Sequence, residues 1–506
     1  MDYLSSPDLK YLVVQMLPYK VLLKTTRNSA TPLYLQIANR LVDLIREGLI
    51  KPGTPLPSSR EMAAILQIHR KTVVAAYEEL NTQDWIESRE RQGVRVAPNL
   101  PDIKPRSFKA FEKSAGYAQP ASFHFNVLQA GPLQQPSANL HRLIINDGFP
   151  DARISPIRKL VQSYSDLFAQ QPVQRKIMYG DIMGAQKLRI ALSLFLADSR
   201  GLNISENNVL ITRGAQMAIY LAARLILRPG STVVVGEPNY AMANSIFSQF
   251  GARLERIAVD ERGIDVEKLA RLCKRKKPDL LYIIPHHHHP TTVTLSSERR
   301  MQILELIRRY NLPVIEDDYD YDFHYSSSPI LPLASADHHG NVIYIGSISK
   351  SFTTTIKIGY MIAPENFIQE ASKMRKLIDI RGDNIMEEAL AQLFEKGDMQ
   401  RHLRKSVKIY HQRRDNLCEM LEKELGEWVS FTRPLGGMAV WTRFSDKIDL
   451  KTLSARLSKR GLYLSDGEFY NTGGKKYNSA RMGFASLNEK EMMEAILMIK
   501  KEIRGK

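Results

Sequence analysis

The sequence predicts an α/β protein in which a small helix-turn-helix block precedes a larger domain with a mainly parallel central sheet. Up to residue 97, apolar residues recur at helical spacing; prolines then interrupt the chain, and from residue 141 short β-branched runs alternate with amphipathic segments. The expected divisions are a lead segment 1–30, the block 31–97, a Pro-containing linker 98–140, and the large domain 141–506. A smaller α/β subdomain is expected within the large domain, from about residue 385 to 506.

Length and composition exclude several classes of protein. A chain of 506 residues is longer than one hydrophobic core usually serves. The longest apolar runs fall short of the roughly 20 residues that span a bilayer, and the start, Met-Asp-Tyr-Leu, has no basic segment before an apolar stretch. We therefore expect a cytoplasmic protein with no membrane span. The only two cysteines, Cys273 and Cys418, fit a reducing compartment and have no metal-ligand spacing.

The charge favours a polyanionic partner, although its distribution is uneven. The formal net charge is +17, but residues 1–97 hold 13 Lys and Arg against 10 Asp and Glu. That block is therefore only +3, and +14 lies in the remainder. Any DNA site in the block must depend on where its individual cations lie.

Three helices are predicted in the block. The first starts after Pro32 and ends before Gly48, and the second starts at a Ser cap in Pro57-Ser58-Ser59-Arg60-Glu61. The third runs from about His69 to Leu80, with Arg70, Lys71 and Thr72 at its N-terminal end. This is helix-turn-helix geometry, in which the start of the second helix of the motif meets base edges in the major groove.

Two short strands are expected after these helices, at 85–88 and 94–96, joined by a tip that carries Arg and Gly. Together PLPSSREMAAIL, HRKTVVAAYEEL and RQGVRVA resemble the winged-helix domain of the GntR superfamily. The resemblance implies that double-stranded DNA is contacted by Arg60, Arg70, Lys71 and Thr72, and that Gly93 lets the wing approach the backbone. The wing of that family usually reads GSGTFV, so Gln92 and Arg95 are departures.

The large domain holds the residue types that pyridoxal 5'-phosphate (PLP) requires. This cofactor needs a lysine for its Schiff base and a carboxylate that keeps its ring nitrogen protonated. Lys350 follows the predicted strand 342–346, and Asp317 ends the predicted strand 313–317, so both are expected where open α/β sheets bind ligands. Tyr319 is expected to hydrogen-bond the ring hydroxyl.

A phosphate site is predicted at the start of an apolar helix. Free backbone N–H groups at a helix N-terminus bind phosphate, and the segment Thr212-Arg213-Gly214-Ala215-Gln216 opens such a helix. The residues expected around the phosphate are Gly214, Ala215, Gln216, Ser347, Ser349 and Lys357.

Nearly the whole chain, from about Pro32 to Ile503, resembles the MocR/GabR-type regulators, which fuse a GntR winged helix to a fold-type I aminotransferase domain. The most specific segments are VIEDDYDYDFHY and VIYIGSISKSF. The resemblance implies that Tyr240 stacks on the cofactor ring and that Arg481 grips the α-carboxylate of an amino acid through a bidentate fork. The other matching segments are GFPD (148–151), YGDIMGAQKLR (179–189), EPNY (237–240), PLGGM (434–438) and ARMGFASL (480–487).

Three departures bear on the site. Lys357 stands where that family has an arginine, which keeps the charge but loses the planar fork. Met242 stands where GABA-responsive members have a second arginine, which argues against an ω-carboxylate ligand. His286–His289, in HHHHPTT, replaces the usual SHQxPTG; we expect no metal there, and a cofactor-facing role for His287 or His288.

Three functions remain open from the sequence. The first is a homodimeric regulator that senses an amino acid, an amine or PLP itself, and thereby controls binding to an operator with repeated half-sites. The second is a working aminotransferase, since Lys350, Asp317, Tyr319 and Arg481 form the minimal apparatus. The third is a regulator that has lost PLP and keeps the large domain as a dimerisation scaffold.

Overall fold

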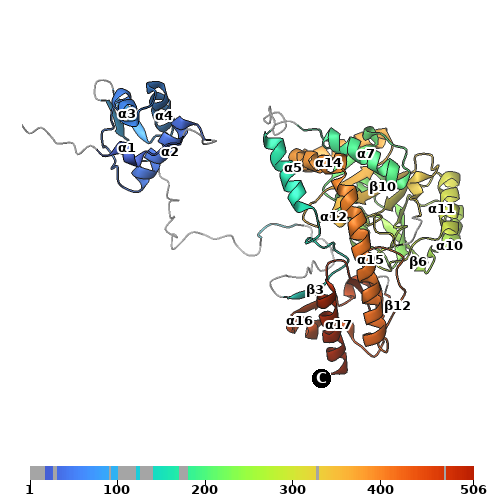
Figure 1. The fold of residues 1–506 in the computed structure, drawn as a ribbon. Coiled ribbons are helices and arrows are strands. Elements are labelled where there is room, and N and C mark those ends of the chain that lie inside the picture. Colours follow the sequence, from blue (N-terminus) through green and yellow to red (C-terminus); the bar gives the residue numbers. More distant parts are fainter. Residues whose placement is uncertain are drawn as a thin grey trace, which may run out of the picture. The chain divides into compact units, whose positions relative to one another are not determined.

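The computed structural model describes residues 17–26, 31–89, 93–100, 121–125, 141–169, 180–325, 330–471 and 474–505. The chain divides into two compact units, Met1–Phe125 and Asn126–Lys506, which are described separately (Figure 1). The expected linker 98–140 lies mostly outside the described residues, so the domain boundaries inferred from the sequence stay predictions. No described helix is long and apolar enough to cross a membrane.

The small unit confirms the predicted helix order. It contains α2 (Leu33–Arg46), α3 (Ser59–Leu66) and α4 (Arg70–Thr82), followed by the antiparallel strands β1 (Ile86–Arg89) and β2 (Gly93–Val96). The three helices pack around one core (Figure 1). Residues of that core with no exposed surface are Ile37, Leu41, Leu44, Met62, Val73, Ala76, Leu80 and Val96.

Local capping explains where the two helices of the motif begin. Ser58 accepts from the Glu61 backbone N–H while the Glu61 carboxylate accepts from the Ser58 N–H at 2.8 Å, which is a capping box. His69 caps α4 by accepting from the Lys71 N–H at 3.2 Å. Helices α3 and α4 therefore both have capped N-termini. The turn between them contains Gln67, whose φ of 55° lies in the left-handed region.

The lead segment contributes a short helix that the sequence did not predict. Helix α1 (Tyr19–Leu22) packs beside α3 and adds Tyr19 and Leu23, both nearly fully buried, to the core of the small unit. The stretch Tyr11 to Leu17, noted as an apolar run, lies outside the described residues apart from Leu17.

The large unit is built on an eight-stranded sheet of order β4-β11-β10-β9-β8-β5-β6-β7. Strands β10, β9, β8, β5 and β6 are parallel, while β11 and β7 run antiparallel to their neighbours. This confirms the mainly parallel sheet. The bounds are β4 (Val209–Thr212), β5 (Thr232–Glu237), β6 (Arg253–Asp260), β7 (Gly263–Ile264), β8 (Leu280–Ile283), β9 (Val314–Asp317), β10 (Val342–Ser347) and β11 (Gly359–Ile362).

Helices cover this sheet, so that β4, β8, β9 and β11 are buried along their whole length. Helices α8 and α13 pack together over the edge that contains β4 and β11, and α10 packs with α11. The helices are α5 (Ile157–Ala169), α7 (Gln186–Arg200), α8 (Ala215–Ile226), α9 (Ala241–Gln249), α10 (Val266–Arg275), α11 (Ser297–Tyr310), α12 (Ile348–Ser351), α13 (Glu365–Asp379), α14 (Asn384–Glu395) and α15 (Asp398–Leu425).

A smaller sheet lies toward the C-terminus, where α15 runs down to α16 and α17 (Figure 1). Its antiparallel order is β12-β13-β15. Strand β14 instead pairs in parallel with β3, a strand from the start of the unit that the sequence had not linked to this region. These elements are β3 (Leu143–Ile145), β12 (Val429–Phe431), β13 (Ala439–Phe444), β14 (Leu462–Leu464), β15 (Ser479–Gly483), α16 (Leu450–Lys459) and α17 (Glu489–Arg504).

Candidate DNA interface and cofactor site

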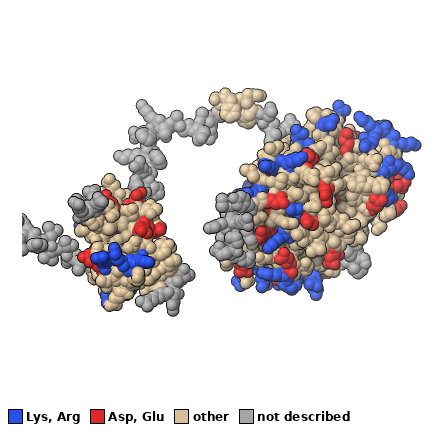
Figure 2. All heavy atoms as spheres, turned by 90° about the horizontal axis from the view of Figure 1, so that it is seen from above, with Lys and Arg blue, Asp and Glu red and all other residues tan. Residues whose placement is uncertain are grey.

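The small unit presents cations at the start of α4. Arg60, Arg70 and Lys71 are exposed, and Arg70 Nε donates to Ser59 Oγ at 3.2 Å, which ties the start of α4 to α3. Thr72 lies beside them and is half-buried. Figure 2 shows Lys and Arg side chains gathered on one exposed face of this unit. Exposed cations at the start of α4, the second helix of the helix-turn-helix motif, suit contact with DNA phosphates and base edges.

The wing is described only at its base. Gly93 opens β2, is exposed, and has a φ of 80°, a conformation that strains any residue with a Cβ. A Cβ at this position would meet nothing within 4 Å, so the backbone there is open to a partner. The expected tip, 90–92, lies outside the described residues.

Asp317 ends β9 with one oxygen satisfied and one not. Tyr282 on β8 donates to Oδ2 at 2.7 Å, whereas Oδ1 is buried with no hydrogen-bond partner among the described residues. Burial raises the pKa of Asp317 to about 7, and the negative charge of Asp318 adds to the effect. A buried carboxylate oxygen without a partner suits a positively charged ring nitrogen.

Lys350 lies in the single-turn helix α12, directly after β10. Its Nζ donates to the Gly148 carbonyl at 2.7 Å and lies 4.6 Å from the ring centroid of Phe149. Burial lowers the pKa of Lys350 to about 8, although the carboxylate of Asp147 opposes this shift. A lysine with such a lowered pKa is partly neutral near physiological pH and can act as a nucleophilic amine.

The remaining ring-contacting candidates gather around this lysine. Lys350 Nζ lies 5.8 Å from the ring of Tyr319, and Arg481 Nη2 donates to the Tyr319 hydroxyl at 3.4 Å. The Tyr319 hydroxyl itself donates to the His287 carbonyl at 2.9 Å. Tyr240 accepts from Gln216 Nε2 at 3.2 Å, and its burial and nearness to Asp317 raise the pKa of its phenol. The structure therefore brings these residues into one cluster.

The expected phosphate cradle has the required backbone. Helix α8 begins after Gly214 without a side-chain cap, so its first N–H groups, those of Ala215 and Gln216, are not engaged by a cap. A Cβ at Gly214 would meet nothing within 4 Å, whereas a Cβ at Gly359 would lie 2.6 Å from the Gly214 backbone. Gly359 therefore lets β11 approach the start of this helix.

The side chains expected at the phosphate differ in whether they are free to bind it. Ser347 Oγ accepts from the Ser349 N–H at 3.2 Å, and Ser349 Oγ donates to the Ile356 carbonyl at 2.7 Å. Both hydroxyls therefore have partners within their own loop. Lys357 is exposed, and its charge helps to lower the pKa of Lys350.

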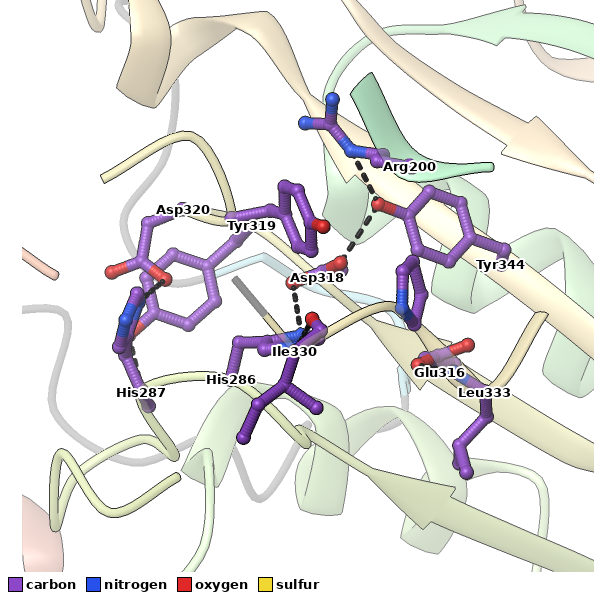
Figure 3. A network of polar contacts seen from close by, with 12 residues as sticks. Arg200, His286, His287, Glu316, Asp318, Tyr319, Asp320, Ile330, Leu333 and Tyr344 are labelled. Atoms are coloured by element: carbon purple, nitrogen blue, oxygen red, sulfur yellow. Dashed lines mark hydrogen bonds and ion pairs between the residues drawn. The ribbon is translucent and has the colours of Figure 1, made fainter. Parts of the chain in front are cut away.

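The four consecutive histidines are all buried and point to different partners. His286 Nδ1 lies 3.1 Å from Asp318 and His287 Nδ1 lies 2.9 Å from Asp320, as Figure 3 shows. His288 Nδ1 lies 3.0 Å from Thr291 Oγ1. Among the described residues no group of three His, Cys, Asp or Glu side chains is arranged to hold a metal ion; the absence of a metal stays a prediction.

His289 is the histidine that faces the site, not His287 or His288 as the sequence had suggested. Its Nε2 lies 2.8 Å from Asp147 Oδ2, and its ring centroid is 5.1 Å from that of Tyr240 and 6.5 Å from that of Tyr319. His287 has a φ of 47°, so the chain is not extended there, and its side chain contacts Asp320 instead.

A buried charged network supports the loop that follows β9. Arg200 Nε donates to the Tyr344 hydroxyl at 2.9 Å, and that hydroxyl donates to Asp318 at 2.8 Å (Figure 3). Arg200 also pairs with Asp322 at 2.9 Å. Asp318 is therefore held on the network side while its neighbour Asp317 is turned the other way.

Sequence reasoning missed four residues at the cofactor site. Tyr282 and His289 were not assigned, although Tyr282 lies within the buried strand β8 and His289 lies in the loop that comes after it. Asp147 immediately precedes the GFPD segment, and Tyr470 donates to Asp147 at 3.1 Å. The position of Asp147 next to a matched motif was the available signal; nothing local to Tyr470 indicated its role.

Comparisons with known proteins agree with this geometry. Residues 149–499 match the model of the aminotransferase class I and II family, and residues 33–96 match that of the gntR family of bacterial regulatory proteins. The chain therefore belongs to the aminotransferase class I and II family and carries a GntR-type helix-turn-helix region in front of that domain.

Two of the similar proteins match this chain over both parts, and a third matches the large domain. An HTH-type transcriptional regulator of Bacillus subtilis named YisV is 28% identical over 92% of this chain and 95% of its own length. The probable rhizopine catabolism regulatory protein MocR of Rhizobium meliloti is 24% identical over 93% of each chain. The kynurenine aminotransferase of Pyrococcus horikoshii, solved with PMP, is 29% identical and covers 72% of this chain and 91% of its own, with a TM-score of 0.66.

This family is PLP-dependent, and the residues present fit that cofactor. The fit rests on the unpartnered Oδ1 of Asp317 and on the uncapped start of α8, because they suit a cationic ring nitrogen and a phosphate respectively. The chain is accordingly a GntR-type regulator fused to a PLP-dependent, aminotransferase-like domain.

Proposed function

We propose that the large domain senses an amino acid, an amine or PLP itself and thereby controls how the winged helices bind an operator with repeated half-sites. The observation that carries this proposal is the pairing, in one chain, of exposed cations at the start of α4 with a buried cluster of candidate PLP-binding residues, in which Asp317 Oδ1 has no partner among the described residues. PLP supplies an electrophilic carbon for the ligand amine when it is bound.

The residues of this chain have separate roles in that proposal. Lys350, with its lowered pKa, holds the cofactor covalently; Asp317 keeps the ring nitrogen protonated; and Tyr319 contacts the ring hydroxyl. Tyr240 stacks on the ring and Arg481 lies where the ligand binds. Residues around the phosphate are Gly214, Ala215, Gln216, Ser347, Ser349 and Lys357.

A homodimer is part of the proposal, and several helices of the large unit carry exposed apolar side chains that a second copy could cover. Leu194 on α7 is 68% exposed, Val161 on α5 is 58% exposed, and Leu377 near the end of α13 is 86% exposed. Helices α5 and α7 both pack against α14. A second copy would present two reading heads to repeated half-sites.

The first test is cofactor attachment. Wild type incubated with PLP and reduced with borohydride should carry the pyridoxyl mass on the peptide that contains Lys350. The Lys350→Ala variant should carry none and should lose the visible absorption band of lysine-bound PLP. The exposed Lys274→Ala, on α10, is the control and should retain both.

The second test is operator control. Duplexes selected by the protein from a random-sequence pool serve as the operator, and their affinity is measured with and without PLP and a panel of amines and amino acids. A coupling free energy of about 1–3 kcal/mol corresponds to a change of roughly 5–150-fold in affinity. Unchanged DNA affinity under every condition, with the cofactor attached, would remove the sensing role.

A working aminotransferase is the second candidate, favoured by the gathering of Lys350, Tyr319 and Arg481 in one cluster. Steady conversion of an amino acid to its keto acid over many cycles, with no effect on DNA affinity, would support it instead.

A further inference from the structure

Arg481, the residue expected to grip a ligand carboxylate, already has a carboxylate beside it. Its side chain is 1% exposed, and its Nε lies 2.7 Å from Asp147 Oδ1. Nη1 donates to the Pro290 carbonyl at 3.2 Å, and Nη2 donates to the Tyr319 hydroxyl at 3.4 Å. The Nε–H is not directed well enough at Asp147 for a hydrogen bond, so that contact is an ion pair. The guanidinium is thus neutralised by the chain itself.

Asp147 is held in place from three sides. Besides Arg481, its Oδ1 accepts from the Tyr470 hydroxyl at 3.1 Å and its Oδ2 lies 2.8 Å from His289 Nε2. Burial alone would raise the pKa of Asp147, but the charge of Arg481 and the N–H donated by His289 outweigh it and hold the pKa well below its usual range, so the carboxyl is ionised at physiological pH. Its side chain is still 39% exposed, so an incoming ligand can meet its charge.

A ligand carboxylate at Arg481 would therefore be placed next to a fixed negative charge. Like charges brought together in a recognition site strongly disfavour binding, and such repulsive elements set specificity. We propose that Asp147 is the resident counter-ion of Arg481, and that the pocket selects a primary amine without an α-carboxylate over the corresponding amino acid. This proposal replaces the expectation that Arg481 grips the α-carboxylate of a ligand. It rests on the proposed function of the PLP site.

His289 Nδ1, beside Asp147, is a hydrogen-bond acceptor that favours a ligand with N–H groups. With Nε2 of His289 donating to Asp147, Nδ1 is an acceptor, and it is buried with no hydrogen-bond partner among the described residues. Burial lowers the pKa of His289, which favours the neutral ring that has this free lone pair. An ammonium or amine N–H can satisfy it, whereas a carboxylate cannot.

The test compares matched ligands that differ only in the carboxylate. PLP-loaded full-length protein is titrated with phenethylamine and phenylalanine, and with cadaverine and lysine, and the visible spectrum of the bound cofactor is followed at equilibrium. Thermal unfolding of the same samples gives an independent reading of binding. Wild type should bind each amine about tenfold or more tightly than its amino acid, the ratio that about 1.4 kcal/mol of discrimination produces.

Three variants assign this preference to the charge. Asp147→Asn and Asp147→Ser should each lower the ratio at least tenfold, and should let 3-phenylpropanoate, a carboxylate without an amine, compete for the site. Asp147→Glu keeps the charge and should keep the preference for amines. Asp260→Asn removes an exposed carboxylate that pairs with Arg299 at 2.7 Å away from the site, and should leave the ratio at its wild-type value.

The outcomes separate this inference from the proposed function. Equal or tighter binding of the amino acids by wild type would overturn the role of Asp147, while the cofactor band and its dependence on Lys350 would leave the PLP site intact. An unchanged ratio in both neutral variants, with both folded, would also overturn it. Failure of wild type to hold PLP at all would instead refute the proposed function.

Discussion

The cations of the two candidate sites lie in opposite environments. In the small unit Arg60, Arg70 and Lys71 are exposed at the start of α4, whereas in the large unit Arg200 and Arg481 have 2% and 1% of their surface exposed. Exposed cations are free for an external polyanion and cost little to remove. Buried cations are bound to carboxylates of the same chain, and removing one leaves a partner charge without compensation. The proposed DNA site therefore uses exposed cations, whereas the cations buried in the large unit hold carboxylates of the same chain in place.

The largest effect should come from breaking the buried network. Arg200→Met removes the partner of Asp322 and the donor to Tyr344, so we expect the free energy of unfolding of the large unit to fall by about 3–5 kcal/mol. Urea unfolding followed by circular dichroism measures it. Arg309→Ala is the control, because that side chain is 61% exposed and pairs only with Glu305 one turn away; its loss should stay below about 0.5 kcal/mol. If Arg200→Met and Arg309→Ala lower the free energy of unfolding equally, then burial does not make the ion pairs of Arg200 more important for stability.

The next effect is a pH dependence at Asp317. Its pKa is raised to about 7 by burial, so between about pH 4, near the ordinary value for a carboxyl, and pH 7 the folded PLP-free protein binds more protons than the unfolded chain. Its stability should therefore decrease as the pH rises through that window and level off above it. Asp317→Asn should lack this component, which amounts to a few kcal/mol at about 1.4 kcal/mol per unit.

The difference between wild type and Asp317→Asn isolates that component, because the other buried carboxyls are common to both. Chemical unfolding of PLP-free protein at several pH values measures it. If the difference in unfolding free energy between wild type and Asp317→Asn stays constant from pH 4 to 8, then folding does not raise the pKa of Asp317. Added PLP should shrink the slope, since a cationic ring nitrogen on Oδ1 favours the ionised carboxylate.

In the small unit, substitution should alter binding and leave stability nearly unchanged. Arg70→Ala and Lys71→Ala should each weaken operator affinity, by about 1–3 kcal/mol for a contact to a base edge, and a phosphate contact should also reduce the salt dependence. Fluorescence anisotropy at several salt concentrations measures both. Arg271→Ala removes a cation of comparable exposure from α10 of the large unit and should change neither quantity. If the Arg70 and Lys71 variants bind like wild type, α4 does not read the operator.

The sequence predicted elements whose causes are local. The helices of the small unit start at Ser58 and His69 because caps and apolar spacing act within one or two turns. Lys350 and Asp317 were predicted for a similar reason, since Asp317 ends one buried strand and Lys350 follows another. The sequence did not predict contacts between distant segments. Strand β3 pairs with β14, and the periodicity of apolar residues carries no signal for that contact.

The pairing of Asp147 with Arg481 shows the same limit at the site. Each residue was visible next to a recognisable segment, GFPD or ARMGFASL, but only the fold brings their charges to 2.7 Å. The direction of His289 was equally inaccessible, because four identical neighbours differ only in which carboxylate or hydroxyl each one meets. Local pattern identifies candidates, and tertiary contacts decide which of them act together.

The smallest predicted effect concerns Ser58, whose side chain caps α3 in the small unit. Ser58→Ala removes the acceptor for the Glu61 N–H and should lower the stability of this helix by about 1 kcal/mol, the usual cost of losing such a cap. Hydrogen exchange of the intact chain measures it, with faster exchange expected in α3 and α4 and no change in the large unit. Ser58→Asp restores an acceptor and should return exchange to the wild-type rate. Faster exchange in the large unit as well would show that the two units do not unfold separately, and the contrast between their cations would then describe one cooperative structure.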